Sequence, residues 1–546
     1  MSDCRFVSSY SWFGIFQMIK KLLLPVFLLL SASLSLWLPS CKPREEELQT
    51  SGGLMFSADT VKFDTVFTTL RTVTKRLWVY NRNAKGVNVD LITLDQPTTS
   101  PYKLIINGDV KQTASNLFIR GNDSLLILVR GEQLPDNGQS GAAKGYVLEE
   151  KLNFNTNGQD QHVLLRSFGQ NIYLHDGTNK AAVLACNEEW KSDRPHVLYG
   201  SVVVGPGCTL RIKPGTRIYG HAGAALIVYG KLLVNAPADF APGTGATDTI
   251  KASDAHIVRF AGDRSSEAQY ATAPGQWTGI VLAADKQGIS QGNIIRYAQI
   301  QNATFGVLLY NPLNLSPQPD VKIQNSVIRY ISGNDVGFAG AASSLGAGGG
   351  VLSLLGKATL ENTLFSDCYE YAVLGNGGTY DLNFCTIANY APTSGIRQTP
   401  SLAFTNTLTD ANGQTLTSAP TITVRNSIVW GSAAVTDELF FDNYDKYPSN
   451  VSVQNSLLRT KLYAAATYTS PNKPGLSNPA YNNLFTDPVF VRANTGSGRD
   501  DYRLKTTSPA RQPGAAVGNR PDQNRDLLNL PRNPTTPSLG AYESLK

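Results

Sequence analysis

Charged residues are scarce in this chain of 546 residues, since Lys, Arg, Asp and Glu together make up 16%, against about 25% in ordinary globular proteins. This scarcity argues against a coiled coil and against a disordered chain kept soluble by charge. Methionine is also scarce, with three residues, whereas the chain has 48 Gly, 29 Pro, 23 Tyr and 21 Phe. Gly and Pro predict many turns and the aromatic residues favour strands, so the composition predicts an all-β protein. The net charge of +6 is too diffuse for a nucleic-acid surface, and no nucleic-acid partner is expected.

The segment that begins at Lys20 has the three parts of a secretory signal. Lys20 and Lys21 precede an apolar run over residues 22–38, and Ser40 is the small residue before Cys41. A basic start, an apolar core and a small residue mark a cleavable signal. A cysteine at the next position resembles the signal of bacterial lipoproteins. In that family the cysteine is acylated and becomes the mature N-terminus, so the resemblance implies a lipid on Cys41 and a membrane as partner.

An uncleaved anchor helix is the alternative for this segment. The apolar run has 17 residues and contains Pro25, which is marginal for a membrane span. We therefore expect a signal peptide over residues 1–40, for which Met18 is a better start than Met1.

The residues after Cys41 are charged. Arg44 is followed by Glu45, Glu46 and Glu47, which resembles the surface-export signal of lipoproteins in the Bacteroidetes group. A plain solvated linker is the alternative. The resemblance implies a lipid-anchored protein of the outer membrane that faces the cell exterior, with residues 41–55 as its tether.

Four further cysteines remain after the signal: Cys186, Cys208, Cys368 and Cys385. None belongs to a Cys-x-x-Cys motif, so neither a metal site nor a redox motif is supported, and no cofactor is expected. An oxidising envelope would permit disulfides, but free thiols buried in a β core are the preferred interpretation.

Residues 56–185 contain short alternating strands separated by turns such as Asn107-Gly108. About seven short strands at this spacing predict an antiparallel β-sandwich. Residues 63–67 and 78–81 resemble the immunoglobulin-like domain that opens many Bacteroidetes surface proteins. Because no catalytic constellation occurs here, a spacer or packing role is expected.

Residues 186–480 change to very short strands that Pro-Gly and Gly interrupt. Such strands leave no room for helical crossovers and predict a coil in which each turn stacks on the one before. A degenerate repeat places an asparagine before an apolar strand, at Asn325, Asn362, Asn426 and Asn455. Asparagine tolerates the left-handed backbone of a tight turn, and stacked asparagines can form a hydrogen-bonded ladder.

Several segments carry a resemblance to a known fold. Residues 206–216, 274–280 and 385–389 look like right-handed parallel β-helix proteins of the pectin-lyase-like fold. Residues 486–490 and 539–543 resemble the closing segment of choice-of-anchor β-helix proteins, so residues 481–546 are expected to close the helix. The resemblance implies a fold but no particular activity, because this fold serves enzymes and passive surface proteins alike.

Two activities of that fold can be tested against the residues. Hydrolysis of the polygalacturonase type needs paired aspartates, and no Asp-Asp pair occurs between Trp190 and Ala480. Elimination of the pectate-lyase type needs carboxylates clustered on Ca²⁺ and a basic side chain. The acids here are scattered singly in sequence, although stacked coils could still bring them together.

The best candidate for a glycan-binding site is a group of polar residues at the start of a long insertion in the predicted β-helix. Asp263, Arg264 and Glu267 precede Trp277, whose ring could stack on a sugar. A structural ion pair and core packing of Trp277 are the competing interpretations, and His221 is expected to be a turn residue.

Two functions therefore stay open. The β-helix is either a non-catalytic module that binds glycan or matrix, which we prefer, or a Ca-dependent lyase acting on uronic-acid polysaccharides.

Overall fold

The structure is a computed structural model that describes residues 47–67, 74–132, 146–241, 254–333, 348–390, 397–409, 415–465, 474–495, 500–511, 513–515 and 524–544. Within these ranges the chain is built from strands β1 to β40, and the helices are three single 3-10 turns: η1 (Tyr444–Lys446), η2 (Pro448–Asn450) and η3 (Pro479–Tyr481). The expected all-β class is confirmed. No helix in the described part is long and apolar enough to cross a membrane, and the predicted signal over residues 1–40, with Cys41, lies outside that part.

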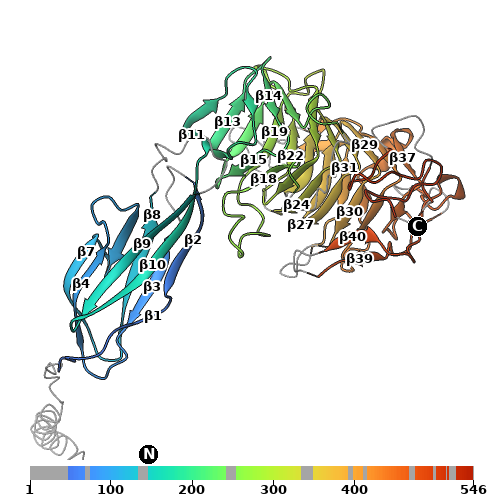
Figure 1. Cartoon of the computed structure of the whole chain (residues 1–546). Helices are drawn as coiled ribbons and strands as arrows, with labels where there is room; N and C mark the ends of the chain where they lie inside the picture. The colour runs from blue at the N-terminus through green and yellow to red at the C-terminus, as the bar shows by residue number, and fades with distance from the viewer. Residues whose placement is uncertain are drawn as a thin grey trace, which may run out of the picture. The chain divides into compact units, whose positions relative to one another are not determined.

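The N-terminal part contains two five-stranded antiparallel sheets (Figure 1). The first, in spatial order, contains β1 (Met55–Phe56), β3 (Lys75–Tyr80), β8 (Ser124–Gly131), β5 (Tyr102–Ile106) and β6 (Asp109–Val110). The second contains β2 (Thr60–Phe67), β10 (Gln159–Gln170), β9 (Tyr146–Thr156), β4 (Val87–Leu94) and β7 (Thr113–Ile119). Burial alternates along the strands, so that Leu77 and Val79 are fully buried while Trp78 between them is 37% exposed. Each sheet therefore has one face in a core and one face outside.

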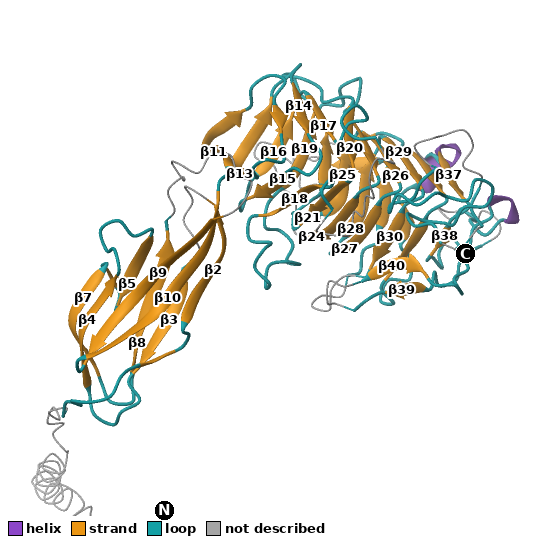
Figure 2. Cartoon of the chain, in the orientation of Figure 1, coloured by secondary structure: helices purple, strands orange, loops and turns teal. Residues whose placement is uncertain are grey.

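The rest of the chain is a long parallel β-structure wound around one axis, as in a parallel β-helix (Figure 2). It begins at β11 (Tyr173–Val183), which pairs in parallel with β13 (His196–Val204), whereas the sequence placed the start at residue 186. The expected order of antiparallel sheets followed by parallel structure is thus confirmed, and the right-handed winding stays a prediction.

Each coil contributes strands to three rows. The nine-stranded sheet contains β12 (Glu189–Trp190), β14 (Thr209–Ile212), β17 (Lys231–Val234), β20 (Asn293–Arg296), β23 (Asp320–Gln324), β26 (Lys357–Glu361), β29 (Thr379–Asn383), β34 (Thr421–Arg425) and β37 (Val451–Gln454). The second row contains β15 (Arg217–Gly220), β18 (Val258–Gly262), β21 (Ala298–Gln301), β24 (Val327–Ile331), β27 (Leu364–Cys368), β30 (Thr386–Asn389), β35 (Ile428–Gly431) and β38 (Leu457–Leu458). The third row contains β16 (Ala225–Val228), β19 (Gly279–Ala283), β22 (Val307–Tyr310), β25 (Gly349–Leu354), β28 (Tyr371–Asn376), β31 (Leu402–Thr405) and β36 (Leu439–Phe441).

Short strands suit this architecture because each needs only a few inward side chains. In β14, Leu210 and Ile212 point into the core and are almost fully buried, whereas the side chains between them are partly exposed. Burying one such aliphatic side chain is worth about 1.5–3 kcal/mol. Two two-stranded ribbons lie outside the rows: β32 (Thr407–Thr409) with β33 (Thr415–Thr417), and β39 (Phe490–Arg492) with β40 (Asp501–Leu504).

The turns from the nine-stranded sheet into the second row use a left-handed backbone. Asn325, Asn362, Asn426 and Asn455 have φ values of 48°, 47°, 50° and 47°. Two of these asparagines contact asparagines of neighbouring coils: Asn426 Nδ2 donates to Asn383 Oδ1, and Asn482 Nδ2 donates to Asn455 Oδ1, both at 3.0 Å. In two other coils Tyr297 and Phe384 have positive φ, at 42° and 53°.

The other two asparagines of the repeat contact the C-terminal segment instead. Asn325 Nδ2 donates to the Asp526 carbonyl at 3.0 Å, and Asn362 Nδ2 donates to the Arg525 carbonyl at 2.9 Å. The apolar side chains of this segment, among them Tyr502, Leu527, Leu539 and Tyr542, share a core with Val327, Leu364, Ile428 and Leu457 of the second row. The C-terminal segment therefore packs along this corner of the β-helix.

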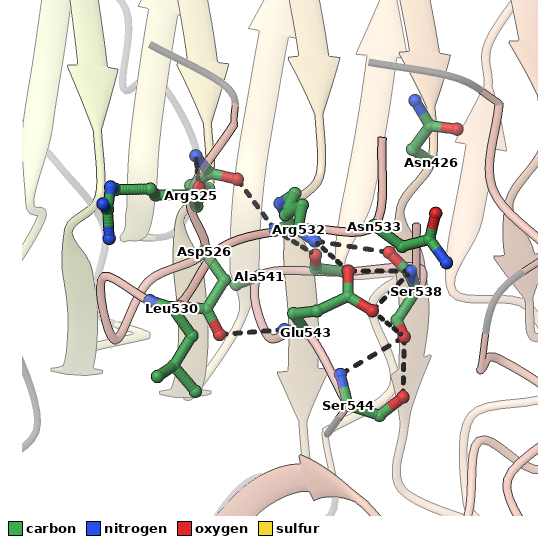
Figure 3. A network of polar contacts seen from close by, with 12 residues as sticks. Asn426, Arg525, Asp526, Leu530, Arg532, Asn533, Ser538, Ala541, Glu543 and Ser544 are labelled. Carbon is green, nitrogen blue, oxygen red and sulfur yellow. Dashed lines mark hydrogen bonds and ion pairs between the residues drawn. The ribbon is translucent and has the colours of Figure 1, made fainter. Parts of the chain in front are cut away.

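Arg532 anchors the C-terminal segment (Figure 3). Its guanidinium is buried and donates to Asn362 Oδ1 and to the Gly540 carbonyl, each at 2.8 Å. It lies 4.1 Å from the centre of the Phe384 ring and 3.7 Å from Glu543 Oε2. Burial lowers the pKa of Arg532 to about 10, but the group still carries its charge at neutral pH.

The cysteines divide into two kinds. Cys186 and Cys208 form a disulfide, so the expectation of free thiols is wrong for this pair, because the first coil brings residues 22 positions apart into contact. Cys368 and Cys385 are free and buried, as expected.

Candidate functional site

The polar candidate predicted from the sequence lies in the insertion between β18 and β19. Arg264 and Glu267 form a two-fold hydrogen-bonded ion pair, with Nε–Oε1 at 2.9 Å and Nη2–Oε2 at 3.2 Å. The guanidinium also covers the Tyr270 ring at 3.6 Å from its centre. Arg264 and Glu267 therefore pair with each other within the loop, as expected for a structural ion pair.

Trp277 does not contribute to a surface. Its side chain is 1% exposed, it belongs to the main core, and its Nε1 donates to the Gln301 carbonyl at 2.9 Å. A sugar ring cannot reach it, so the interpretation of Trp277 as a stacking platform is wrong. The tryptophan follows the insertion at the point where the chain returns to the core.

Asp263 instead contacts His221 on the preceding coil. His221 Nδ1 and Asp263 Oδ2 are 2.6 Å apart, and the imidazole stacks on Tyr199 at 4.1 Å between ring centres. The hydrogen bond to Asp263 raises the pKa of His221. In the described part of the chain no group of three or more His, Cys, Asp or Glu residues could hold a metal ion, so the structure brings no calcium-binding carboxylate cluster to these residues.

A different site, a cavity of about 350 Å³, lies on the last coil. Its lining residues come from η1, β37 and the segment that ends in η3: Tyr444, Val451, Ser452, Val453, Gln454, Pro474, Gly475, Leu476, Asn478 and Tyr481. This volume lies in the usual range for small-molecule pockets. We call it the last-coil pocket.

The end of the nine-stranded sheet creates this pocket. Strand β37 pairs with β34 on one side, and no further strand of the described chain joins its other side in that sheet. Loop residues take the place of a further strand. The backbone N–H of Asn455 donates to the Tyr481 carbonyl at 2.8 Å, and Asn483 Nδ2 donates to the Val453 carbonyl at 2.9 Å. The loop therefore lies beside the strand and leaves the cavity between them.

Both polar and aromatic side chains line the last-coil pocket. Tyr444 is 9% exposed and Tyr481 is 36% exposed, so the first is a fixed wall and the second a rim. Ser452 and Gln454 are exposed and alternate with the inward Val453, because side chains two apart project to the same side of a strand. Their side chains form no hydrogen bond with any residue that the structure describes.

The last-coil pocket offers hydroxyl, amide and aromatic groups to a ligand. Among the residues that the structure describes, its lining contains tyrosine, serine and amide side chains and no carboxylate, imidazole, lysine or arginine. Histidine and carboxylates, the commonest general acid–base groups, are thus missing from the described lining, whereas tyrosine, which can also transfer a proton, is present. Aromatic rings with hydroxyl and amide groups suit an uncharged polyhydroxyl ligand.

A second, smaller cavity of about 20 Å³ lies between the second row and the C-terminal segment. Its lining includes Arg329, Tyr330, Asp367, Asp500 and Tyr502. The volume suffices for about one water molecule. Burial, helped by the charge of the nearby Asp500 carboxylate, raises the pKa of Asp367 to about 6.

Sequence reasoning did not find the last-coil pocket. Gln454 was visible only as part of the repeat that ends in Asn455, and Tyr444 and Tyr481 stand in loops with no periodic pattern. One signal was available: Asn482 directly follows Tyr481 and has a positive φ of 50°, like the predicted asparagines. An extension of the repeat to Asn482 would have placed Tyr481 beside the last coil.

Comparisons with known proteins add little. No protein-family model matches the chain, and no curated protein matches it. One solved structure, a family 123 glycoside hydrolase from Clostridium perfringens, matches with 10% identity over 26% of this chain and 30% of that chain, at a TM-score of 0.16. An overlap of this size carries no information about the fold or the activity of this protein.

Proposed function

We propose that this protein is a surface-exposed lipoprotein of the outer membrane whose β-helix binds a glycan without cleaving it. The last-coil pocket supports this function, because it combines two tyrosines with exposed hydroxyl and amide groups, and its described lining has no carboxylate or imidazole. Aromatic rings pack on the apolar faces of sugars, while hydroxyl and amide groups fix their orientation. The absence of charged side chains among the described lining residues favours a neutral sugar unit.

A binding experiment tests the glycan part. A soluble form that starts at residue 42 is titrated by calorimetry against a panel of neutral and uronic-acid oligosaccharides. Tyr481→Ala and Gln454→Ala should each weaken binding by about five- to tenfold, since each removes one contact worth about 1–1.5 kcal/mol. Tyr173→Ala is a matched control, because Tyr173 is 40% exposed but lies on β11 in the first coil.

Several results would contradict the proposal. If Tyr173→Ala and Tyr481→Ala weakened glycan binding equally, the glycan would not bind specifically in the last-coil pocket. Release of unsaturated products from uronic-acid polysaccharides, with or without Ca²⁺, would show a lyase instead of a binding protein.

Lipid attachment and display are tested separately in a related host. Cys41→Ala should abolish incorporation of a fatty-acid analogue, and equal labelling of both proteins would contradict lipidation. Replacement of Glu45, Glu46 and Glu47 by alanine should keep the label but lower protease accessibility on whole cells. Unchanged accessibility would assign these residues to the linker.

A further inference from the structure

One outer face of the N-terminal part carries apolar side chains. Trp78 lies opposite Leu126, Met55 lies opposite Tyr80, and Ile105 lies opposite Val110 in their antiparallel pairs. Directly opposite residues project to the same side of a sheet. Trp78, Met55 and Val110 are 37%, 58% and 73% exposed, and Leu126 and Ile105 are partly exposed. We call this the outer face of the β3 sheet.

Cationic side chains lie on the same face as these apolar residues. Arg76 precedes Trp78 by two positions on β3, and Lys103 precedes Ile105 by two positions on β5, so both project to the same face. Neither forms an ion pair with any residue in the described ranges. Arg130, at the end of β8, pairs with Glu132 at 3.2 Å. The face therefore combines apolar side chains with the cationic side chains of Arg76 and Lys103.

The predicted lipid is attached close to this sheet. Glu47 forms an ion pair with Lys85 at 2.7 Å, and the Gln49 amide donates to the Gly86 carbonyl at 2.8 Å. The six residue-to-residue steps from Cys41 to Glu47 can span at most about 22 Å. Lys85 follows the end of β3 by five positions, so the tether to the predicted lipid joins the sheet near the end of the strand that bears Trp78.

We infer that the outer face of the β3 sheet rests on the membrane leaflet that holds the Cys41 lipid. This inference depends on the lipidation stated under the proposed function and adds a second membrane contact to it. Tryptophan favours the interface between water and lipid, and basic side chains are attracted to anionic head groups. A polysaccharide is the other occupant to consider, but aliphatic and cationic neighbours of Trp78 fit a lipid surface better than a sugar chain, which prefers amide and hydroxyl partners.

Vesicle binding of the unlipidated protein isolates this second contact. The soluble form that starts at residue 42 is sedimented with vesicles of phosphatidylcholine that contain one third phosphatidylglycerol. The Arg76→Gln/Lys103→Gln double variant should bind at least tenfold more weakly, at about fivefold per cationic residue, and so should Trp78→Ala. Phe118→Ala and Lys151→Gln are the matched controls, because both side chains are exposed on the other sheet.

Each outcome decides the inference. Selective loss in the β3-sheet variants, with wild-type binding in the controls, supports it. The inference is overturned if the wild-type protein does not bind the vesicles, or if the control variants lose as much binding as the β3-sheet variants. It is also overturned if Trp78→Ala weakens binding to the oligosaccharides and leaves vesicle binding unchanged. The vesicle experiment uses the unlipidated protein, so it does not depend on lipidation. A failure of lipidation would be seen only in the fatty-acid labelling of Cys41.

Discussion

Asp367 offers a direct test of how the C-terminal segment is held against the β-helix. Its carboxyl lines the cavity of about 20 Å³ together with Arg329 and Asp500. Burial raises its pKa from 3.8 to about 6, the Asp500 charge acts in the same direction, and hydrogen bonding from Ser366 and the charge of Arg329 oppose the shift. The folded protein therefore binds the Asp367 proton more tightly than the unfolded chain does.

The sign and size of the effect follow from linkage. A carboxyl whose pKa is raised on folding stabilises the folded state least when it is ionised, so stability falls as pH rises from about 4 to about 6 and then stays constant. A shift of two pKa units corresponds to about 3 kcal/mol. Asp367→Asn removes the charge at every pH. We expect the variant to be more stable than wild type by up to about 3 kcal/mol at pH 8 and to lose this advantage at pH 4.

Urea denaturation of the soluble form at pH 4, 5, 6, 7 and 8 measures the difference. Asp367 has a positive φ of 51°, which asparagine tolerates better than most residues, but that contribution does not depend on pH. Asp501→Asn is the opposite control, because the hydrogen bond from Arg503 lowers the pKa of Asp501 and its loss should destabilise the protein at neutral pH. A pH-independent difference between wild type and Asp367→Asn would refute the reasoning.

Three further changes are expected to alter stability. Arg532→Met leaves a buried carboxylate without its cation and should cost about 3–5 kcal/mol, seen as early proteolysis of the C-terminal segment; a protease pattern like that of wild type would contradict the anchor. Asn362→Ala should cost about 1–3 kcal/mol more than Asn122→Ala, because both residues have a positive φ but only Asn362 is buried; equal melting temperatures would mean that its side-chain bonds contribute nothing. Cys186→Ser opens the loop to Cys208 and should cost about 3 kcal/mol, and reductant should lower the melting temperature of wild type but not of the variant.

The fold class could be predicted from the sequence because its signals are local. Short apolar strands, Pro-Gly breaks and the asparagines at 325, 362, 426 and 455 each report on a few neighbouring residues. A coil that stacks on its neighbour repeats the same local conformation, and the left-handed turns at these asparagines belong to that conformation. The start of the parallel structure was placed too late, because β11 reads as one more alternating strand and only its pairing with β13 shows that it is parallel.

The candidate site could not be predicted because it depends on which coil a loop reaches. Tyr444 and Tyr481 stand 37 positions apart and line one pocket only because β37 is the last strand of its sheet. Trp277 and Asp263 come from one insertion, yet the register of the coils buries the first and joins the second to His221.

The sequence by itself determined that the chain is all-β, that antiparallel sheets precede stacked parallel coils, and that asparagine occupies the turns, because the preferences of a few consecutive residues suffice for each. Only the tertiary structure decided which side chains are buried and which long-range partners meet. Arg532 and Asn362 lie 170 positions apart, and Cys186 finds Cys208 through the first coil. Such contacts depend on loop lengths and on the register between coils, which no local pattern of residues specifies.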